Sequence, residues 1–173
     1  MSTSTGARAA HGNYTDHGTP KGSTTLTPFL AVTPAADAIA FYTEVFGAIL
    51  VSSTEMPGPD GSPAIAHAVL DFGHGRLELG EPNPAFHLAA LTGGDEAVYS
   101  MGLYCPDVDA VVARAVERGA AVREPATDFV SGDRFASIRD PFGVRWSVMT
   151  RVEDISDEES GRRVAEWAAG LSG

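Results

Sequence analysis

The stretch SGDRFASIRDPFGVRWSVMT, residues 131–150, decides how the second half of this chain folds. It carries two runs of alternating apolar and polar residues, separated by DPFG at positions 140–143. Pro fixes φ and Gly permits positive φ, so this segment predicts a tight reversal between antiparallel strands. We expect Ile138 to lie opposite Trp146 on the core-facing side. The other side would then carry a mixed set that suits a small-molecule pocket: Phe135, Ser137, Ser147 and Met149.

The composition of the chain excludes several classes of function. With 173 residues and a net charge of −11, it is an acidic chain of one-domain length. It lacks the basic stripe that nucleic acids or anionic membranes require, so we expect neither as a partner. There is no apolar run of the roughly 18 residues that a membrane span needs. The single cysteine, Cys105, cannot form an intrachain disulfide, which favours a cytoplasmic location.

Residues 1–22 predict a flexible arm, because they are rich in Ser, Thr, Gly and Ala. The arm has no apolar segment of the kind that a signal peptide contains. His11 and His17 fall within it, and we expect both side chains to be solvated.

A repeated segment predicts a duplicated fold. PAADAIAFYTEVFGA from Pro34 matches PDVDAVVARAVERGA from Pro106, and Gly47 matches Gly119 at the same offset of 72 residues. Each copy predicts a helix that begins at the proline and ends at the glycine. We therefore expect an α+β fold of two tandem βαβββ modules, with eight strands in a mixed sheet around a concave cup.

This repeat gives the domain boundaries. After the arm, a first module with its connector would span residues 23–96, and a second module residues 97–151. Residues 152–173 form an acidic tail, in which Ser156 and Glu159 fit the capping box of a short helix. Trp167 would dock this helix on the domain or on a partner subunit.

Alternation along the predicted strands assigns residues to the cup. A hairpin around residues 73–74 places position 69 across from 78, so His67 and Glu78 would share the non-core face within reach of each other. A strand over residues 24–32 would direct Leu26 to the core and Thr27 and Phe29 to the cup. A strand over residues 98–105 likewise directs Ser100 and Tyr104 to the cup, and Cys105 to the core as an inert thiol.

These segments resemble the vicinal oxygen chelate superfamily, which includes glyoxalase I, bleomycin-resistance proteins and extradiol dioxygenases. Within it, the chain is most similar to the PhnB-like group. The resemblance covers about residues 24–159, through TLTPFLAV, AIAFYTEVFGA, AHAVL, DVDAVVARAVERGA, GDR, DPFGVRWSVMT and VEDISDEE. It implies the glyoxalase/bleomycin resistance-like fold and a homodimer.

The resemblance also implies where metal ligands would stand. Metal-dependent members hold their ion with four side chains, and the matching positions here are Thr27, Glu78, Ser100 and Ser147. Only Glu78 is a ligand that transition metals favour, because they prefer imidazole, carboxylate or thiolate to hydroxyl groups. We therefore expect no metal cofactor. The alternative is a divalent metal at a substituted site, in which His67 joins Glu78.

Three functions remain open at this point. The first is a metal-free protein that binds or sequesters an aromatic or drug-like molecule, as bleomycin-resistance members do. The second is an enzyme of the isomerase, lyase or dioxygenase type that uses Glu78 with His67, with or without a divalent metal. Without a metal, Glu78 would act as general base or acid in an isomerisation, and a lyase or oxygenase step would need the metal. The third is a subunit whose cup is vestigial. For the first, the predicted ligand contacts are Thr27, Phe29, Ser100, Tyr104, Phe135, Ser137, Ser147 and Met149, with Arg139, Arg76 or Glu78 for a charged group.

Overall fold

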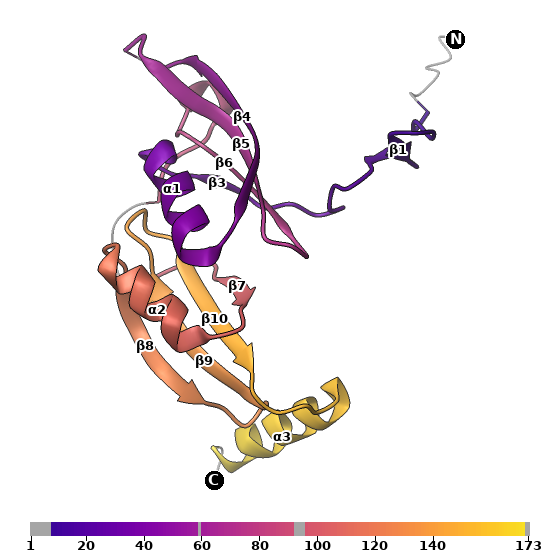
Figure 1. Cartoon of the computed structure of the whole chain (residues 1–173), viewed down its shortest axis with the longest axis vertical. Helices are drawn as coiled ribbons and strands as arrows, with labels where there is room; N and C mark the ends of the chain where they lie inside the picture. Colours follow the sequence, from indigo (N-terminus) through magenta and orange to yellow (C-terminus); the bar gives the residue numbers. More distant parts are fainter. Residues whose placement is uncertain (1–7, 59, 92–95, 172–173) are drawn as a thin grey trace.

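The computed structural model describes residues 8–58, 60–91 and 96–171, and it contains two modules of the same topology (Figure 1). The first module comprises β3 (Phe29–Ala31), α1 (Ala35–Phe46), β4 (Ile49–Pro57), β5 (Pro63–Asp71) and β6 (Arg76–Gly80). The second comprises β7 (Met101–Tyr104), α2 (Val108–Glu117), β8 (Ala121–Asp128), β9 (Asp133–Arg139) and β10 (Arg145–Arg151). Outside them lie β1 (Thr15–Asp16), β2 (Thr19–Pro20), the 3-10 turn η1 (Pro84–Phe86) and α3 (Asp157–Gly170).

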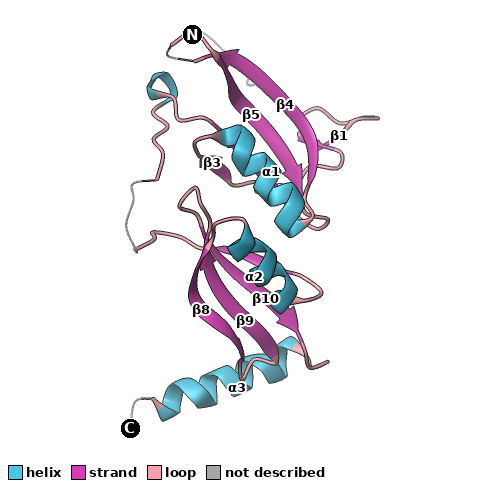
Figure 2. Ribbon diagram, turned by 60° about the vertical axis from the view of Figure 1, so that its left-hand side comes forward, coloured by secondary structure: helices cyan, strands magenta, loops and turns pink. Residues whose placement is uncertain are grey.

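Each module forms its own four-stranded mixed sheet, in the order β3-β6-β5-β4 and β7-β10-β9-β8. In both, the first and last strands of the module pair in parallel and the other pairs are antiparallel. The shared strand order confirms the predicted α+β fold of tandem βαβββ modules. The two sheets lie one beyond the other along the long axis of the molecule, and α1 and α2 lie on the same side of them (Figure 2).

The ends of α1 follow the sequence signals, whereas α2 is capped by Asp107 and Arg118, each one residue inside the predicted Pro106 and Gly119. Pro34 precedes α1, and Gly47 ends it in the left-handed conformation at φ 73°. Pro34 supplies no side-chain cap; the Glu81 carboxylate, directly after β6, accepts a hydrogen bond from the Ala35 amide at 2.6 Å. The start of α2 has a corresponding bond from the last strand of its own module, in which the Thr150 hydroxyl accepts from the Val108 amide at 2.9 Å.

The strand registers confirm the predicted pairings. Trp146 lies opposite Ile138 across the β9–β10 hairpin, and Val69 lies opposite Glu78 across the β5–β6 hairpin. Trp146 and Ile138 are both buried. Gly143 closes the DPFG turn at φ 89°, a conformation that glycine adopts without strain.

The two modules share one core, and Asp140 of the DPFG turn joins them. The buried Asp140 carboxylate accepts hydrogen bonds from the Tyr42 hydroxyl of α1 at 2.7 Å and from the Trp146 indole N–H at 2.9 Å. Its other oxygen accepts from the amides of Phe142 and Val144. Burial raises the pKa of Asp140, although these four hydrogen bonds act in the opposite direction.

An aromatic cluster surrounds this carboxylate. The Trp146 ring lies 5.2 Å from Tyr42, 4.6 Å from Phe46 and 6.1 Å from Phe72, measured between centroids. Three of the four rings belong to the first module, and Trp146 belongs to the second. Packing at these separations favours association of the modules beyond simple apolar burial.

The structure contradicts the prediction of a strand over residues 24–32. Pairing covers only Phe29–Ala31, and Leu26, which we expected in the core, is 85% exposed. The hydroxyl groups of Thr24 and Thr27 hydrogen-bond to each other at 2.7 Å, which bends the chain before the strand begins. Pro28 then offers no amide donor, so the ladder starts after it.

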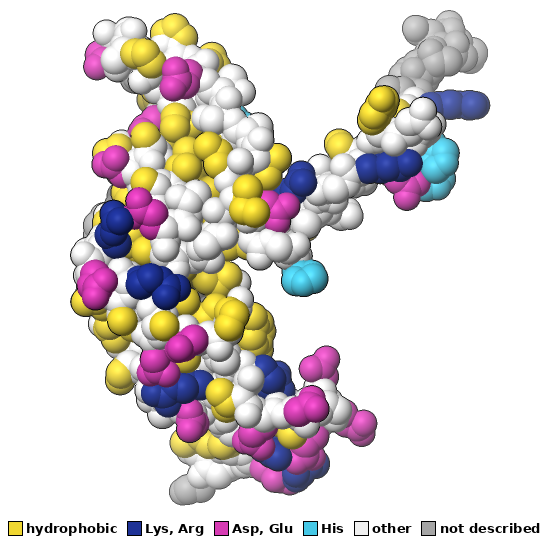
Figure 3. All heavy atoms as spheres, viewed as in Figure 1, with side chains coloured by type: hydrophobic (Ala, Val, Ile, Leu, Met, Phe, Trp, Pro, Cys, Tyr) yellow, Lys and Arg dark blue, Asp and Glu magenta, His cyan; other side chains and the backbone are white. Residues whose placement is uncertain are grey.

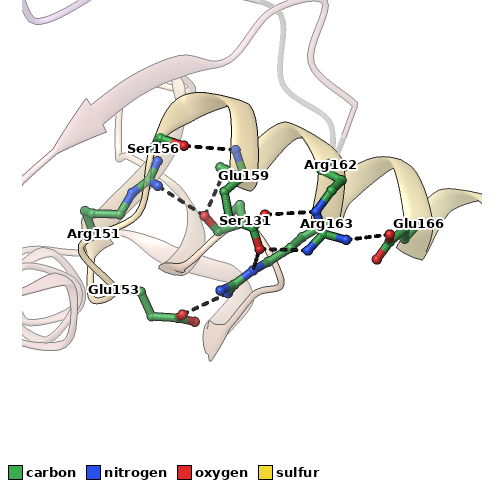
Figure 4. Close-up of polar contacts among 9 residues, drawn as sticks. Ser131, Arg151, Glu153, Ser156, Glu159, Arg162, Arg163 and Glu166 are labelled. Carbon is green, nitrogen blue, oxygen red and sulfur yellow. Dashed lines mark hydrogen bonds and ion pairs between the residues drawn. The ribbon is translucent and has the colours of Figure 1, made fainter.

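Polar contacts hold the terminal helix α3 against the second module (Figure 4). Ser156 caps α3 by accepting a hydrogen bond from the Glu159 amide, as the capping-box pattern predicts. Arg163 pairs with both Glu153 and Glu159. The Ser131 carbonyl accepts hydrogen bonds from Arg151 and from the Ser160 hydroxyl.

The apolar residues of α3 contribute less to its position. Trp167 meets Phe129 edge-on at 5.0 Å but stays 45% exposed. Leu171 is 69% exposed.

Among the helices of the described residues, none is long and apolar enough to cross a bilayer.

Candidate functional site

The predicted site residues fall into two groups, one on each sheet. On the first sheet, His67 Nε2 lies 3.3 Å from Glu78 Oε2, which confirms that these residues share a face within reach of each other. Phe29 pairs with Glu78 across the parallel strands β3 and β6, and its ring stacks on His67 at 6.1 Å between centroids. We call Phe29, His67 and Glu78 the first half-site.

The first half-site is a polar pair beside an aromatic wall. The side chains of His67 and Glu78 are 43% and 34% exposed, so both are open to a ligand. Thr27 lies just before β3, outside the ladder, and its hydroxyl is bonded to Thr24.

On the second sheet, Ser100 and Ser147 come together. Their hydroxyl oxygens are 2.8 Å apart, although Ser100 lies before β7 and Ser147 is in the middle of β10. Met149 lies opposite Phe135 on β9 and beside Tyr104 on β7. We call Ser100, Ser147, Met149, Phe135 and Tyr104 the second half-site.

Two other predicted contacts have partners within the chain. Ser137 lies opposite Ser147 as expected, but its side chain is fully buried and its hydroxyl accepts a hydrogen bond from Arg145 Nε at 3.0 Å. Arg139 ends β9, and its guanidinium lies against Gly143 of the DPFG turn. The Ser137 hydroxyl is therefore not open to the second half-site in the way that Ser147 is.

Tyr104 has a partner that the strand pattern could not show. Its hydroxyl donates to Asp133 at 3.3 Å, and Asp133 also pairs with Arg151 at 2.8 Å and accepts from the Ser131 hydroxyl. Asp133 is buried, so these contacts compensate for the loss of solvent around its carboxylate. The ring of Tyr104 remains 57% exposed.

A cavity of about 370 Å³ lies between the modules, where the β5–β6 turn approaches β7. It is lined by Phe72, His74, Gly75, Arg76, Met101, Gly102, Leu103, Tyr104 and Trp146. Of these lining residues, only Tyr104 was predicted to contact a ligand, with Arg76 as one possible partner for a charged group on it. Trp146 was expected in the core alone, because alternation within a strand does not show which ring reaches the gap between two sheets.

A second cavity, of about 700 Å³, contains none of the predicted site residues. It lies beside the start of α1 and includes the acidic residues Glu55, Asp60 and Glu81. Glu81 already accepts a hydrogen bond from the α1 amide of Ala35 there.

The donor set at the four expected ligand positions does not fit a divalent transition metal. Ser100 and Ser147 satisfy each other, Thr27 is bonded to Thr24, and only Glu78 offers a carboxylate. Adding His67 gives two ligands of the kind that zinc, iron or nickel prefers, whereas catalytic zinc sites use three. We therefore derive no chemical step through a metal at this site.

Comparison with known proteins identifies relatives of the chain. Residues 24–148 match the model of the Glyoxalase/Bleomycin resistance protein/Dioxygenase superfamily. An uncharacterized protein of Mycobacterium bovis is 33% identical over 138 residues, which cover 78% of this chain and 88% of that protein.

Two solved structures share the fold. Protein PA1353 of Pseudomonas aeruginosa has a TM-score of 0.61 at 24% identity, over 74% of this chain and 98% of that one. The PhnB protein of Bacillus cereus has a TM-score of 0.58 at 19% identity, over 73% of this chain and 99% of that one.

Proposed function

The chain belongs to the glyoxalase/bleomycin resistance protein/dioxygenase superfamily, and from this premise we propose that it binds a small aromatic or drug-like molecule without a metal ion. The observation that carries the proposal is the hydroxyl pair of Ser100 and Ser147, which stand where metal-dependent members are expected to have ligands. Phe29, Phe135 and Met149 add apolar walls around the polar groups of both half-sites. A pocket formed from such residues would hold an organic ligand by apolar contact and use a few polar groups for orientation.

A second copy of the chain would complete this site. The half-sites lie on separate sheets, and β3 and β7 are edge strands with one unpaired side each. Next to these edges, Leu26 is 85% exposed and Val98 is 94% exposed. In a homodimer, the first half-site of one subunit would face the second half-site of the other, and the exposed apolar residues would be covered.

Ligand binding is tested with metal-free protein. The untagged chain is dialysed against EDTA and screened by thermal shift against a panel of aromatic and drug-like compounds, and hits are measured by calorimetry. Phe29→Ala and Phe135→Ala should each weaken binding about tenfold or more, because each removes an apolar wall worth at least about 1.4 kcal/mol. Phe86→Ala is the matched control, since Phe86 is a 60% exposed ring on η1.

Three results would contradict this proposal. Binding that EDTA abolishes and a divalent metal restores would show that a metal site is present after all. A panel in which no compound raises the melting temperature would remove the support for ligand binding. A monomer by light scattering, with the ligand bound, would exclude the shared site.

A second candidate function rests on the contact between His67 and Glu78. A carboxylate beside an imidazole can remove a proton next to a carbonyl group of a bound ligand, with the imidazole stabilising the changing charge. This predicts an isomerase or epimerase.

The reaction is tested on the ligand that the screen identifies. In D₂O, the enzyme would exchange a C–H of the ligand for deuterium, as followed by NMR. Glu78→Gln should abolish exchange and retain ligand binding, and the control Glu117→Gln, on the exposed end of α2, should leave exchange unchanged. Binding without any exchange in the wild-type protein would exclude this function.

A further inference from the structure

The arm that precedes the first module carries a cluster of metal-binding side chains outside both half-sites. His11 Nδ1 lies 3.0 Å from Asp16 Oδ1, and His17 Nε2 lies 3.7 Å from the same oxygen. The ligand atoms of the three residues all lie within 4.8 Å of one another. Figure 3 shows histidine and acidic side chains together near the end of the arm, away from the body of the molecule.

The spacing of these atoms matches a tetrahedral metal site. With zinc–nitrogen and zinc–oxygen bonds of roughly 2.0–2.2 Å, neighbouring ligand atoms are separated by about 3.3–3.6 Å. The two measured separations, 3.0 and 3.7 Å, lie close to this range. Two imidazoles and one carboxylate form a ligand set that zinc accepts, and a water molecule can take the fourth position.

The backbone of the arm fixes this arrangement without help from the core. Thr15 and Asp16 of β1 pair with Pro20 and Thr19 of β2, and hydrogen bonds from the Gly12 amide to the Thr15 carbonyl and from the Gly18 amide to the Ala10 carbonyl, both at 2.8 Å, hold residues 10–12 against this hairpin. The two-residue turn between β1 and β2 has positive φ at both His17 (45°) and Gly18 (89°), as the common type I′ hairpin turn requires.

The two imidazole rings also approach each other in a way that packing does not explain. Their centroids are 4.6 Å apart, yet the side chains of His11 and His17 are 62% and 84% exposed. Solvated side chains have no apolar core to bring them together. Convergence on one carboxylate oxygen aims a nitrogen of each ring at a common point.

We propose that His11, Asp16 and His17 bind a divalent transition-metal ion of the zinc class, with water as the remaining ligand. Within the parts of the chain that the structure describes, no other three His, Cys, Asp or Glu side chains converge in this way. The site is independent of the proposed ligand site, whose four expected positions do not fit a metal.

The proposal is tested by titrating the untagged, EDTA-treated full chain with Co²⁺ and Zn²⁺. We expect one Co²⁺ per chain with the intense visible absorption of tetrahedral cobalt, displaced by Zn²⁺. His11→Ala, Asp16→Ala and His17→Ala should each weaken binding by roughly 100-fold, since loss of even an outer-shell partner costs about 10- to 100-fold. The double variant His74→Ala/His87→Ala is the matched control, because both residues are exposed and lie outside the arm.

Each outcome of these titrations decides the question. Binding that survives His11→Ala and His17→Ala, or that is lost in the His74/His87 variant, would overturn the assignment. So would a wild-type chain that acquires no tetrahedral cobalt spectrum. Far-UV circular dichroism and the melting temperature should be the same for all metal-free variants, since the arm lies outside the core.

Discussion

The substitution Asp140→Asn is expected to weaken the contact between the modules and so to lower the free energy of unfolding. The change keeps the shape of the side chain but exchanges one acceptor oxygen for an NH₂ group. Both oxygens of Asp140 accept two hydrogen bonds each, from Tyr42 and Trp146 on one side and from the amides of Phe142 and Val144 on the other. Whichever way the amide turns, its NH₂ group meets at least one N–H that has no other partner.

The magnitude follows from these contacts. The Tyr42 hydroxyl can rotate and accept a hydrogen bond, but the Trp146 indole N–H can only donate. A buried donor left without a partner costs about 1–3 kcal/mol, so we expect Asp140→Asn to lower the free energy of unfolding by that amount at acidic pH. At a pH where the wild-type carboxyl is ionised, the wild-type protein buries a charge and the asparagine variant does not. The variant avoids that desolvation cost, which offsets part of the stability lost with the hydrogen bond.

The pH dependence of this difference has a definite sign. The pKa of Asp140 is raised in the folded state, so the folded protein binds this proton more tightly than the unfolded chain does. Stability from this group is therefore greatest at low pH. It decreases as the pH rises from the unfolded-state value of about 3.9 through the raised folded-state value. The difference in free energy of unfolding between wild type and Asp140→Asn should therefore become smaller as the pH rises over that interval.

Urea unfolding followed by tryptophan fluorescence, at a series of pH values, measures both effects. Asp128→Asn is the control, because Asp128 is a 74% exposed partner of Arg134 and such a surface pair contributes about 0–1 kcal/mol. The reasoning would be refuted if Asp140→Asn unfolded at the same urea concentration as wild type at every pH. It would also fail if the difference widened as the pH rose.

Substitutions at two further positions, Gly80 and Glu81, probe how the first module is held together. Gly80→Ala places a Cβ atom 2.4 Å from the Ala66 carbonyl oxygen, and such overpacking should lower the free energy of unfolding by about 1–3 kcal/mol. Gly102→Ala is the control, because its Cβ atom would lie 3.7 Å from the nearest atom and should change the melting temperature little. Glu81→Ala removes the carboxylate that caps α1 and should cost about 0.5–2 kcal/mol in urea unfolding, whereas Glu81→Gln should retain most of the stability. Equal stability of Gly80→Ala and Gly102→Ala, or of the two Glu81 variants, would contradict these accounts.

Features that depend on neighbours in sequence could be predicted from the chain alone. Gly47 ends α1, and the DPFG turn sets Ile138 opposite Trp146, because both depend on backbone conformations that Gly and Pro determine locally. The two-residue hairpin turn likewise fixed the approach of His67 to Glu78. Once a turn is known, register follows from the period of two in a strand.

Features that depend on distant residues could not be predicted in this way. The bond between Tyr42 and Asp140 joins positions 98 residues apart, and nothing in either segment indicates it. The strand over residues 24–32 was predicted too long, because alternation alone cannot show that the bend at Thr24 and Thr27 stops pairing. The hairpin that brings His11 to Asp16 lies in a segment whose composition indicated only flexibility.

The geometry of β10 shows how the fold of the superfamily can be kept while residues on the open face of the strand vary. Trp146 and Val148 point into the core, where Trp146 contacts the Asp140 carboxylate, and both are almost fully buried. Ser147 and Met149 alternate with them on the opposite face. A substitution at position 147 therefore leaves the contacts of Trp146 intact. The contacts of the DPFG turn restrict which residues the fold accepts at buried positions, but they do not restrict the residues on the open face of β10. Family membership accordingly predicts the fold strongly and the activity weakly, and the activity has to be argued from the residues on the open face.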